Sequence, residues 1–382
     1  MTSTSDDRLR QWQRNRAQRL DTLPWLKVDR GNGRPVRYVA DELLVRVERE
    51  GDARGVLNAA GHPRQSVTAE EVAPGVLALR AHGMDVPGAA RALRRGGADT
   101  AGPNHVFIST PYEMGGPFGP PVPDVDAWSL PAGPSPSAAV RVAVVDTGIW
   151  RDSPLPSGWY EATSDDYDDT VDPDADVGHA NFITGVIMSS TSNARVRIVK
   201  VLDASGLCTE SQLVTALLKL PPVDVVNLSL GGFTDGDQPP AILSDALGQL
   251  LTGFDRVVVA AAGNEGTVDE PYWPAAFAGT GLPWAGQVLA VAAHDGSSVC
   301  DWSNTGAWVS LAAPGSDITS TYVTQGEFTS GLARWSGTSF AAPRVAAAIA
   351  EHHASAGTVV GAVAKVRADA STRSFGPYPG LG

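Results

Sequence analysis

The second part of the chain is built from short apolar runs that each end in a polar residue or glycine. Helix-like text separates two of these runs, as in TESQLVTALLKL at 209–220. Strands that are apolar along their whole length and alternate with helices predict a parallel sheet with both faces covered. We therefore expect an α/β fold over residues 138–382, with a parallel sheet sandwiched by helices. The runs are VRVAVVD at 140–146, VRIVKVL at 196–202, VDVVNLSL at 223–230, DRVVVAAAGN at 255–264 and QVLAVAA at 287–293.

The first part of the chain has another pattern. Segment 36–50, VRYVADELLVRVERE, alternates apolar and polar residues like a half-buried strand. Two further strands are predicted at 75–81 and 104–110, and a short amphipathic helix at 87–97. These elements predict a small α+β domain over residues 36–111.

The segments around this domain are less regular. Residues 1–35 form a polar, Arg-rich N-terminal arm, whose first 22 residues we expect as a surface helix or a loose segment. Residues 112–137 are too rich in Pro and Gly for regular structure, which predicts a linker between two domains.

Composition narrows the class of protein. A chain of 382 residues is long enough for about two domains, and its formal charge of −13 argues against nucleic acid as the main partner. No run of 18 apolar residues predicts a membrane span, and the N-terminus lacks the apolar core of a signal peptide. Cys208 and Cys300 match neither a disulfide framework nor a metal site. We expect a cytoplasmic protein without cofactor or metal, although an export route that needs no such signal stays open.

Four polar residues stand where the predicted strands end or the predicted helices begin. Asp146 ends the first strand, Asn264 follows another, and His179 and Ser339 each open a helix of small or apolar residues. Reactive groups gather at the carboxyl ends of parallel strands. Taken singly, Asp146 and Ser339 are equally explained as helix caps and His179 as a structural histidine. Taken together, they supply the carboxylate, base, oxyanion donor and nucleophile that acyl transfer requires.

The motifs around these residues occur in an order that resembles the subtilisin-like serine peptidases, or subtilases, over about residues 138–350. They are DTG at 146–148, GH at 178–179, NLSLGG at 227–232, AAAGNEG at 260–266, AAPGSDITST at 312–321 and SGTSFAAP at 336–343. The resemblance implies a serine endopeptidase that acts on peptides or proteins. In it Asp146 orients His179, His179 activates Ser339, and Asn264 stabilises the oxyanion.

The resemblance also implies how a substrate binds. Ser229, Leu230 and Gly231 correspond to a strand edge on which a substrate peptide pairs through its main chain. Gly263 would border the pocket for the residue before the cut. The domain at 36–111 resembles the propeptide domains that precede many subtilases, which implies that the chain's own N-terminal domain is its inhibitor. An accessory domain that is never removed is the alternative.

The sequence departs from the family pattern beside the predicted base. Ala180 and Asn181 stand where the family carries Gly-Thr, a change that could tilt the imidazole of His179. The segment after Gly185 is too short for the calcium loop that many subtilases insert there, so we expect that site to be absent. The acidic run at 161–176 has three interpretations: a solvated loop, a patch for basic substrate residues, or a calcium site.

A second function class also fits the resemblance. A catalytically silent, peptide-binding scaffold would keep the same fold, and the Ala180-Asn181 pair is the feature that favours it. A lipase or esterase is disfavoured because the chain has no G-x-S-x-G turn and because the order Asp, His, Ser differs from that fold.

Overall fold

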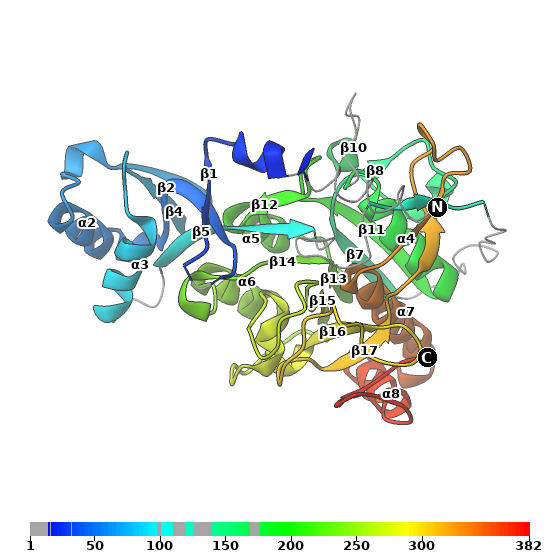
Figure 1. Ribbon diagram of the computed structural model, residues 1–382. Helices are drawn as coiled ribbons and strands as arrows, with labels where there is room; N and C mark the ends of the chain where they lie inside the picture. The colour runs from blue at the N-terminus through cyan, green and yellow to red at the C-terminus, as the bar shows by residue number, and fades with distance from the viewer. Residues whose placement is uncertain are drawn as a thin grey trace.

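The computed structural model describes residues 14–15, 17–31, 33–97, 101–109, 120–125, 140–168 and 176–382. The chain forms two parts that lie side by side (Figure 1). A small N-terminal unit carries α2 and α3 against one sheet, and a larger unit surrounds a second sheet.

The N-terminal unit is an antiparallel sheet covered by two helices. Its central strand β2, Val36–Arg46, pairs with β4, Val76–Arg80, on one side and with β5, Ala101–Ser109, on the other. Strand β3, Thr68–Ala73, pairs with β4. Helices α2, Glu50–Ala59, and α3, Val86–Arg95, bury Leu57 and Leu93 against this sheet.

The domain boundary predicted at residue 36 needs correction. Strand β1, Leu26–Asp29, lies in the predicted arm but pairs with the first residues of β2. Its sequence, LKVD, does alternate apolar and polar residues, but over four residues only, which is too short a run to reveal a strand. The described residues 17–21 are helical, as the arm prediction allowed.

The predicted linker is also partly regular. Strand β6, Val122–Pro123, pairs with β19, Leu332–Trp335, of the larger unit. The carboxylate of Asp124 accepts a hydrogen bond from the Thr319 hydroxyl at 2.7 Å. The other residues of the predicted linker, 112–119 and 126–137, lie outside the described residues.

The larger unit contains the predicted parallel sheet, and the α/β fold is confirmed. Its order is β17-β16-β15-β13-β7-β11-β9, and all of these pairs are parallel. Strand β17 was missed by the sequence analysis. The strands are β7, Val140–Asp146, β9, Tyr160–Glu161, β11, Ala194–Lys200, β13, Val225–Leu228, β15, Val257–Ala261, β16, Val288–His294, and β17, Leu311–Pro314.

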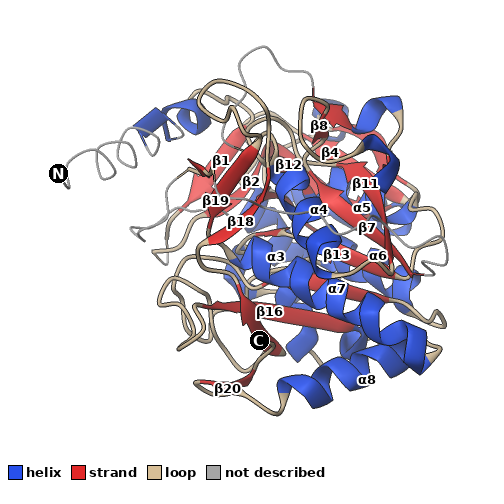
Figure 2. Cartoon of the chain, turned by 90° about the vertical axis from the view of Figure 1, so that its right-hand side faces the viewer, coloured by secondary structure: helices blue, strands red, loops and turns tan. Residues whose placement is uncertain are grey.

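Helices cover both faces of this sheet because its strands are apolar on both. In β7, Val142 and Val144 face α4, His179–Ser190, α7, Thr338–Ala356, and α8, Val359–Ala370. Ala143 and Val145 face α5, Glu210–Leu218, and α6, Ala241–Leu251. Helices α7 and α8 lie on the face turned to the viewer in Figure 2.

Shorter elements complete the fold. They are the strands β8, Ile149–Trp150, β10, Tyr167–Asp168, β12, Leu207–Thr209, β14, Leu230–Gly231, β18, Ile318–Thr321, β20, Ser374–Phe375, and β21, Tyr378–Pro379, and the 3-10 helices η1, Val47–Arg49, η2, Arg64–Ser66, η3, Ser157–Trp159, η4, Ser164–Asp166, η5, Asp235–Asp237, η6, Ala275–Gly279, and η7, Ala285–Gln287.

The two parts share one sheet. Strand β5 of the N-terminal unit pairs antiparallel with β12 and with β14, both of which belong to the larger unit. The last residues of β5 therefore lie between two strands of the larger unit, beside the carboxyl ends of its parallel sheet.

Candidate active site

The predicted base and its carboxylate are joined. Asp146 is the last residue of β7 and His179 is the first residue of α4, and His179 Nδ1 lies 2.7 Å from Asp146 Oδ1. Both side chains are fully buried. The same carboxyl oxygen accepts a hydrogen bond from the Thr147 N–H at 2.8 Å. A carboxylate accepts only, so Nδ1 carries the hydrogen and Nε2 is the basic nitrogen.

Ser339 lies beside the predicted substrate strand. Its hydroxyl donates to the Ser229 carbonyl at 3.3 Å, and its own carbonyl accepts from the Ser229 hydroxyl at 2.9 Å. Among the described residues His179 Nε2 has no hydrogen-bond partner, so the structure does not join it to Ser339. The ring of Phe340, the next residue, lies 5.5 Å from the His179 ring, centroid to centroid. A base-to-nucleophile hydrogen bond often tightens only when substrate is bound.

The helix that carries Ser339 is not capped by it. Helix α7 begins at Thr338 after Gly337, which has no side chain to cap it, and the N–H of Thr338 is bonded to Asn264. The Ser339 hydroxyl bonds to Ser229 instead, so the cap interpretation of this serine is wrong. The small residues that follow it bury α7 against β13, β15 and β16, because their short side chains allow close approach.

Asn264 is fixed in one orientation. Its Oδ1 accepts from the Thr338 N–H at 2.8 Å and from the Thr338 hydroxyl at 2.9 Å. An N–H only donates, so the amide oxygen must face Thr338 and the NH₂ group must face the other way. Thr338 is a residue that the sequence analysis missed. The threonine in the GTS motif was the signal that could have found it.

The predicted substrate strand and pocket lie around one tyrosine ring. A Cβ built on Gly231 would lie 2.3 Å from Tyr272 Cε1, and one built on Gly263 would lie 3.0 Å from Tyr272 Cδ1. Gly263 also has a φ of 98°, which disfavours any other residue there. Leu230 of β14 is buried in the same apolar cluster as Tyr272. The structure therefore brings Ser229, Leu230, Gly231 and Gly263 together along one side of the site.

The unusual pair after His179 has a structural explanation. Asn181 is fully buried, its Oδ1 accepts from the Trp150 N–H at 2.8 Å, and its NH₂ donates to the Trp150 carbonyl at 3.0 Å. The Ala180 N–H donates to the Thr147 hydroxyl at 3.0 Å. Both residues hold segments beside Asp146, and the short His179–Asp146 distance is kept with them in place.

The acidic run is only partly solvated. Asp166, Asp168 and Asp176 are all less than 10% exposed. Asp166 accepts from Arg197, and Asp168 pairs with Lys200 at 2.7 Å. Burial raises the pKa of Asp168 above its usual value, although Lys200 opposes this shift. For these three residues the solvated-loop interpretation is wrong, whereas residues 169–175 of the run lie outside the described residues.

Strand β5 lies along Ser229–Gly231, in the position where we predicted that a substrate peptide would pair. Ser109 is opposite Leu230 and Ile108 is opposite Gly231 in an antiparallel register, while Leu207 of β12 is opposite Ile108 on the other side. The Ser109 N–H donates to the Gly206 carbonyl at 2.8 Å. Main-chain pairing on both sides is how an extended peptide would bind to these two strand edges.

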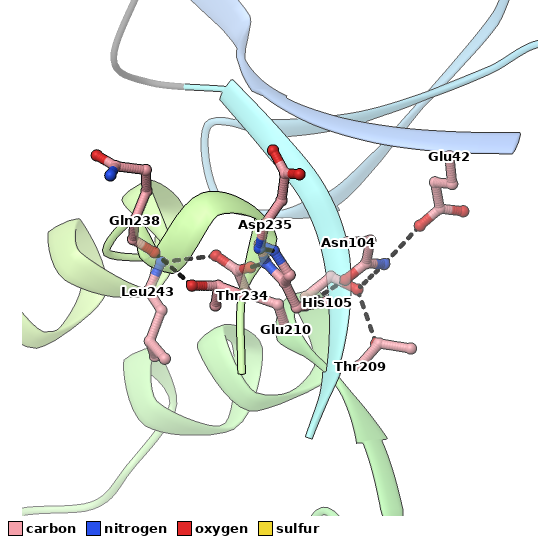
Figure 3. A network of polar contacts seen from close by, with 10 residues as sticks. Glu42, Asn104, His105, Thr209, Glu210, Thr234, Asp235, Gln238 and Leu243 are labelled. Carbon is pink, nitrogen blue, oxygen red and sulfur yellow. Dashed lines mark hydrogen bonds and ion pairs between the residues drawn. The ribbon is translucent and has the colours of Figure 1, made fainter. Parts of the chain in front are cut away.

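A buried polar network holds β5 on the larger unit (Figure 3). His105 Nδ1 lies 2.8 Å from Glu210 Oε2, and Glu210 Oε1 accepts from the Leu243 N–H at 3.1 Å. Asn104 donates to the Ser211 hydroxyl at 3.0 Å and accepts from the Ser211 N–H at 3.1 Å. Asp235 contributes carboxylate oxygens to Arg91 and Arg94 of α3 at 2.7 Å and 2.6 Å.

The described residues give no sign of a metal site. No group of three or more His, Cys, Asp or Glu side chains in this part of the chain is arranged to hold an ion. Residues 191–193 alone join α4 to β11, where the calcium loop would be inserted. Nor is any helix in the described ranges both long and apolar enough to cross a membrane. Cys208 and Cys300 are free and buried, and burial raises the pKa of Cys300 to about 12.

Comparison with known proteins gives consistent matches over the larger unit. Residues 137–366, more than half of the chain, match the model of the subtilase family. The thermophilic serine proteinase of Bacillus sp. (strain AK1) is 32% identical over 265 residues, which cover 64% of this chain and 61% of that protein. Thermitase of Thermoactinomyces vulgaris is 31% identical over 233 residues, covering 58% of this chain and 75% of that protein.

A solved structure agrees with these relatives. The crystal structure of a cold adapted subtilisin-like serine proteinase superimposes with a TM-score of 0.51 at 26% identity, covering 64% of this chain and 87% of that one. The match to the first relative spans less than two thirds of its length. The order of motifs, the parallel sheet and the family match agree: the chain belongs to the subtilase family of serine peptidases.

Proposed function

We propose that the protein is a serine endopeptidase that hydrolyses peptide bonds through an acyl-enzyme intermediate. Ser339 is the nucleophile, His179 the general base and acid, and Asp146 the carboxylate that orients the imidazole. The observation that carries this proposal is the 2.7 Å bond between His179 Nδ1 and Asp146, which leaves the buried Nε2 as the proton acceptor.

The residues would act in sequence. Ser339 Oγ attacks the peptide carbonyl as its proton passes to His179 Nε2. The negative oxygen that forms receives hydrogen bonds from the NH₂ group of Asn264, and loss of one such donor typically lowers kcat by about 10²–10³-fold. His179 then gives its proton to the leaving amine, and water repeats the cycle to release the acyl group. Thr338 positions Asn264 throughout, because it holds the amide oxygen away from the reacting carbonyl.

We further propose that the N-terminal unit inhibits the enzyme. Strand β5 fills the position between β12 and β14 on which a substrate would pair, and Ser339 and His179 are both fully buried. Apolar packing and main-chain pairing hold the unit there, together with polar contacts from His105 to Glu210 and from Arg91 and Arg94 to Asp235. All of these contacts are non-covalent, and a substrate would gain access once this unit has moved away or has been removed. The peptide-binding scaffold keeps the same contacts but would lack the chemistry.

Labelling with a fluorophosphonate tests both proposals. Intact mass is measured for the wild-type chain, Ser339→Ala, and the double variant Arg91→Glu/Arg94→Glu, which repels Asp235. We expect one adduct on wild type, none on Ser339→Ala, and at least tenfold faster labelling of the double variant. The control is Arg95→Glu, a charge change on the same helix at a residue for which no bond to Asp235 is found.

Each outcome separates the alternatives. Absence of labelling in wild type and in the double variant would leave the scaffold as the function. Labelling at equal rates in wild type and the double variant would refute inhibition by the N-terminal unit while keeping the peptidase. Loss of the first hundred or so residues in wild type but not in Ser339→Ala would show that the unit is removed by the enzyme itself.

A further inference from the structure

Ser109 makes a side-chain contact that the proposed mechanism does not use. Its hydroxyl donates to Asp176 Oδ1 at 3.2 Å, and both side chains are fully buried. Asp176 lies three residues before His179, and its carbonyl accepts the His179 N–H at 3.0 Å. The Asp176 carboxyl group of the larger unit therefore contacts the Ser109 side chain close to His179. Ser109 belongs to β5, the strand that lies in the predicted substrate position.

The space around this contact is closed by Gly206. A Cβ on Gly206 would lie 2.1 Å from Ser109 Oγ and 2.9 Å from the Asp176 carboxyl carbon. The Gly206 φ of 71° also disfavours any other residue. The Gly206 carbonyl meanwhile accepts the Ser109 N–H. This main-chain bond fixes where the Ser109 side chain points, and the close contacts leave room for a small side chain only.

We propose that Asp176 is a specificity-determining residue, which selects a small hydroxyl-bearing residue, serine above all, at the substrate position that Ser109 occupies. This inference rests on the proposed function, in which β5 stands in for a substrate. A hydrogen bond to a buried carboxyl group discriminates strongly, because a substrate lacking the donor leaves that group with one partner fewer. The close approach of Gly206 excludes larger side chains by size, which is a separate effect.

Two ratios of kcat/KM, Ser peptide to Ala peptide and Ala peptide to Leu peptide, distinguish the effect of the hydroxyl group from the effect of side-chain size. Internally quenched peptides carry the chain's own sequence, NHVFI-X-T, where X is Ser, Ala or Leu. They are assayed with the Arg91→Glu/Arg94→Glu chain, with the active fraction measured by fluorophosphonate. We expect kcat/KM for the Ser peptide to exceed that for the Ala peptide by at least tenfold, and that for the Leu peptide by more.

Variants at Asp176 give the decisive comparison. When Asp176→Ala is added to the same chain, the kcat/KM values for the Ser and Ala peptides should differ by no more than about threefold. Asp176→Asn should give a ratio of these two values between that of Asp176→Ala and that of the chain with Asp176. The Ala-to-Leu ratio should change little, because Gly206 sets the size limit. General damage to the fold lowers all rates together and does not move these ratios. A Ser-to-Ala ratio that stays the same in Asp176→Ala overturns the inference.

A measurement without catalysis keeps the inference separate from the proposed function. Amide hydrogen exchange of residues 106–109 is followed in the full chain for Ser109→Ala, Asp176→Ala and the combined variant. We expect Ser109→Ala to speed exchange about tenfold when Asp176 is present and less than threefold when it is absent. This coupling without any fluorophosphonate labelling would support the binding site and refute the peptidase. Labelling without coupling would refute the role of Asp176 alone.

Discussion

The central sheet of the larger unit and the contact between the two units differ in the share of polar groups that they bury. The sheet buries continuous apolar rows, such as Val142 and Val144 against α4, α7 and α8. The contact also has an apolar part, in which Leu44 and Phe107 of the N-terminal unit share one buried cluster with Leu213 of the larger unit. In addition, it buries His105 and Glu210 and pairs Asp235 with two arginines. Apolar burial gains free energy without needing a particular partner atom, whereas buried polar groups are stable only while each partner is in place. The polar groups of the contact are therefore the part of it that a single change of partner can weaken, whereas the apolar rows of the sheet have no such partner to lose.

The largest change in the free energy of unfolding should come from a substitution in the apolar core of the larger unit. Phe182 is fully buried in α4, and its ring lies 4.3 Å from that of Phe340 and 5.8 Å from that of Trp335. Phe182→Ala should lower the free energy of unfolding by about 3–5 kcal/mol, since it leaves a cavity. Urea unfolding measures this loss. A loss below about 1 kcal/mol would mean that the core rearranges around the change.

The next effect concerns the buried pair at the contact. Glu210→Ala leaves the His105 imidazole and the Leu243 N–H without their acceptor, which should cost about 3 kcal/mol. Glu210→Gln keeps an acceptor for one of them and should cost less. Because the cost falls on the contact, amide exchange in β5 should rise in Glu210→Ala while exchange in β15 stays unchanged. Equal increases in both strands would contradict the distinction between sheet and contact.

A pH effect on stability is expected at the end of β16, the strand next to the edge of the parallel sheet. Burial lowers the pKa of His294, whose ring stacks on Phe375 at 3.6 Å and whose Nε2 lies 2.7 Å from the Leu381 carbonyl. The unfolded chain binds the proton more readily, so stability falls as pH drops below about 6.5, the ordinary value. His294→Gln should remove this part of the pH dependence. Urea midpoints of both chains at pH 7.5 and pH 5 provide the comparison.

The smallest effect should come from an exposed ion pair between the units. Arg46 of β2 pairs with Asp245 of α6, and both side chains remain partly exposed. Arg46→Met keeps most of the side-chain stem and should change the free energy of unfolding by less than about 1 kcal/mol. It should also leave the fluorophosphonate labelling rate within about twofold of wild type. A large increase in labelling would show that partly exposed pairs, too, control release of the N-terminal unit.

The success of the sequence analysis followed the strength of the local pattern. The apolar runs placed β7 at Val140–Asp146, and the GTS and GN motifs selected Ser339 and Asn264 as site residues. Strand β17, Leu311–Pro314, was missed because its run is short and stands beside a proline. Strands β1 and β6 were assigned to an arm and a linker because each is short; β1 pairs with the next strand along the chain, and β6 with β19, about 210 residues away. The cytoplasmic location and the catalytic roles stay predictions.

The sequence by itself determined the α/β class, the family and the residue types at the site, because these depend on periodicity and on short motifs. Only the tertiary structure decided which partners those residues have. It tied Asn264 to Thr338, which is 74 residues away, and Ser109 to Asp176, which is 67 residues away. It also laid β5 between β12 and β14. Such contacts depend on how the chain folds back on itself in space, and no local pattern of apolar and polar residues records that.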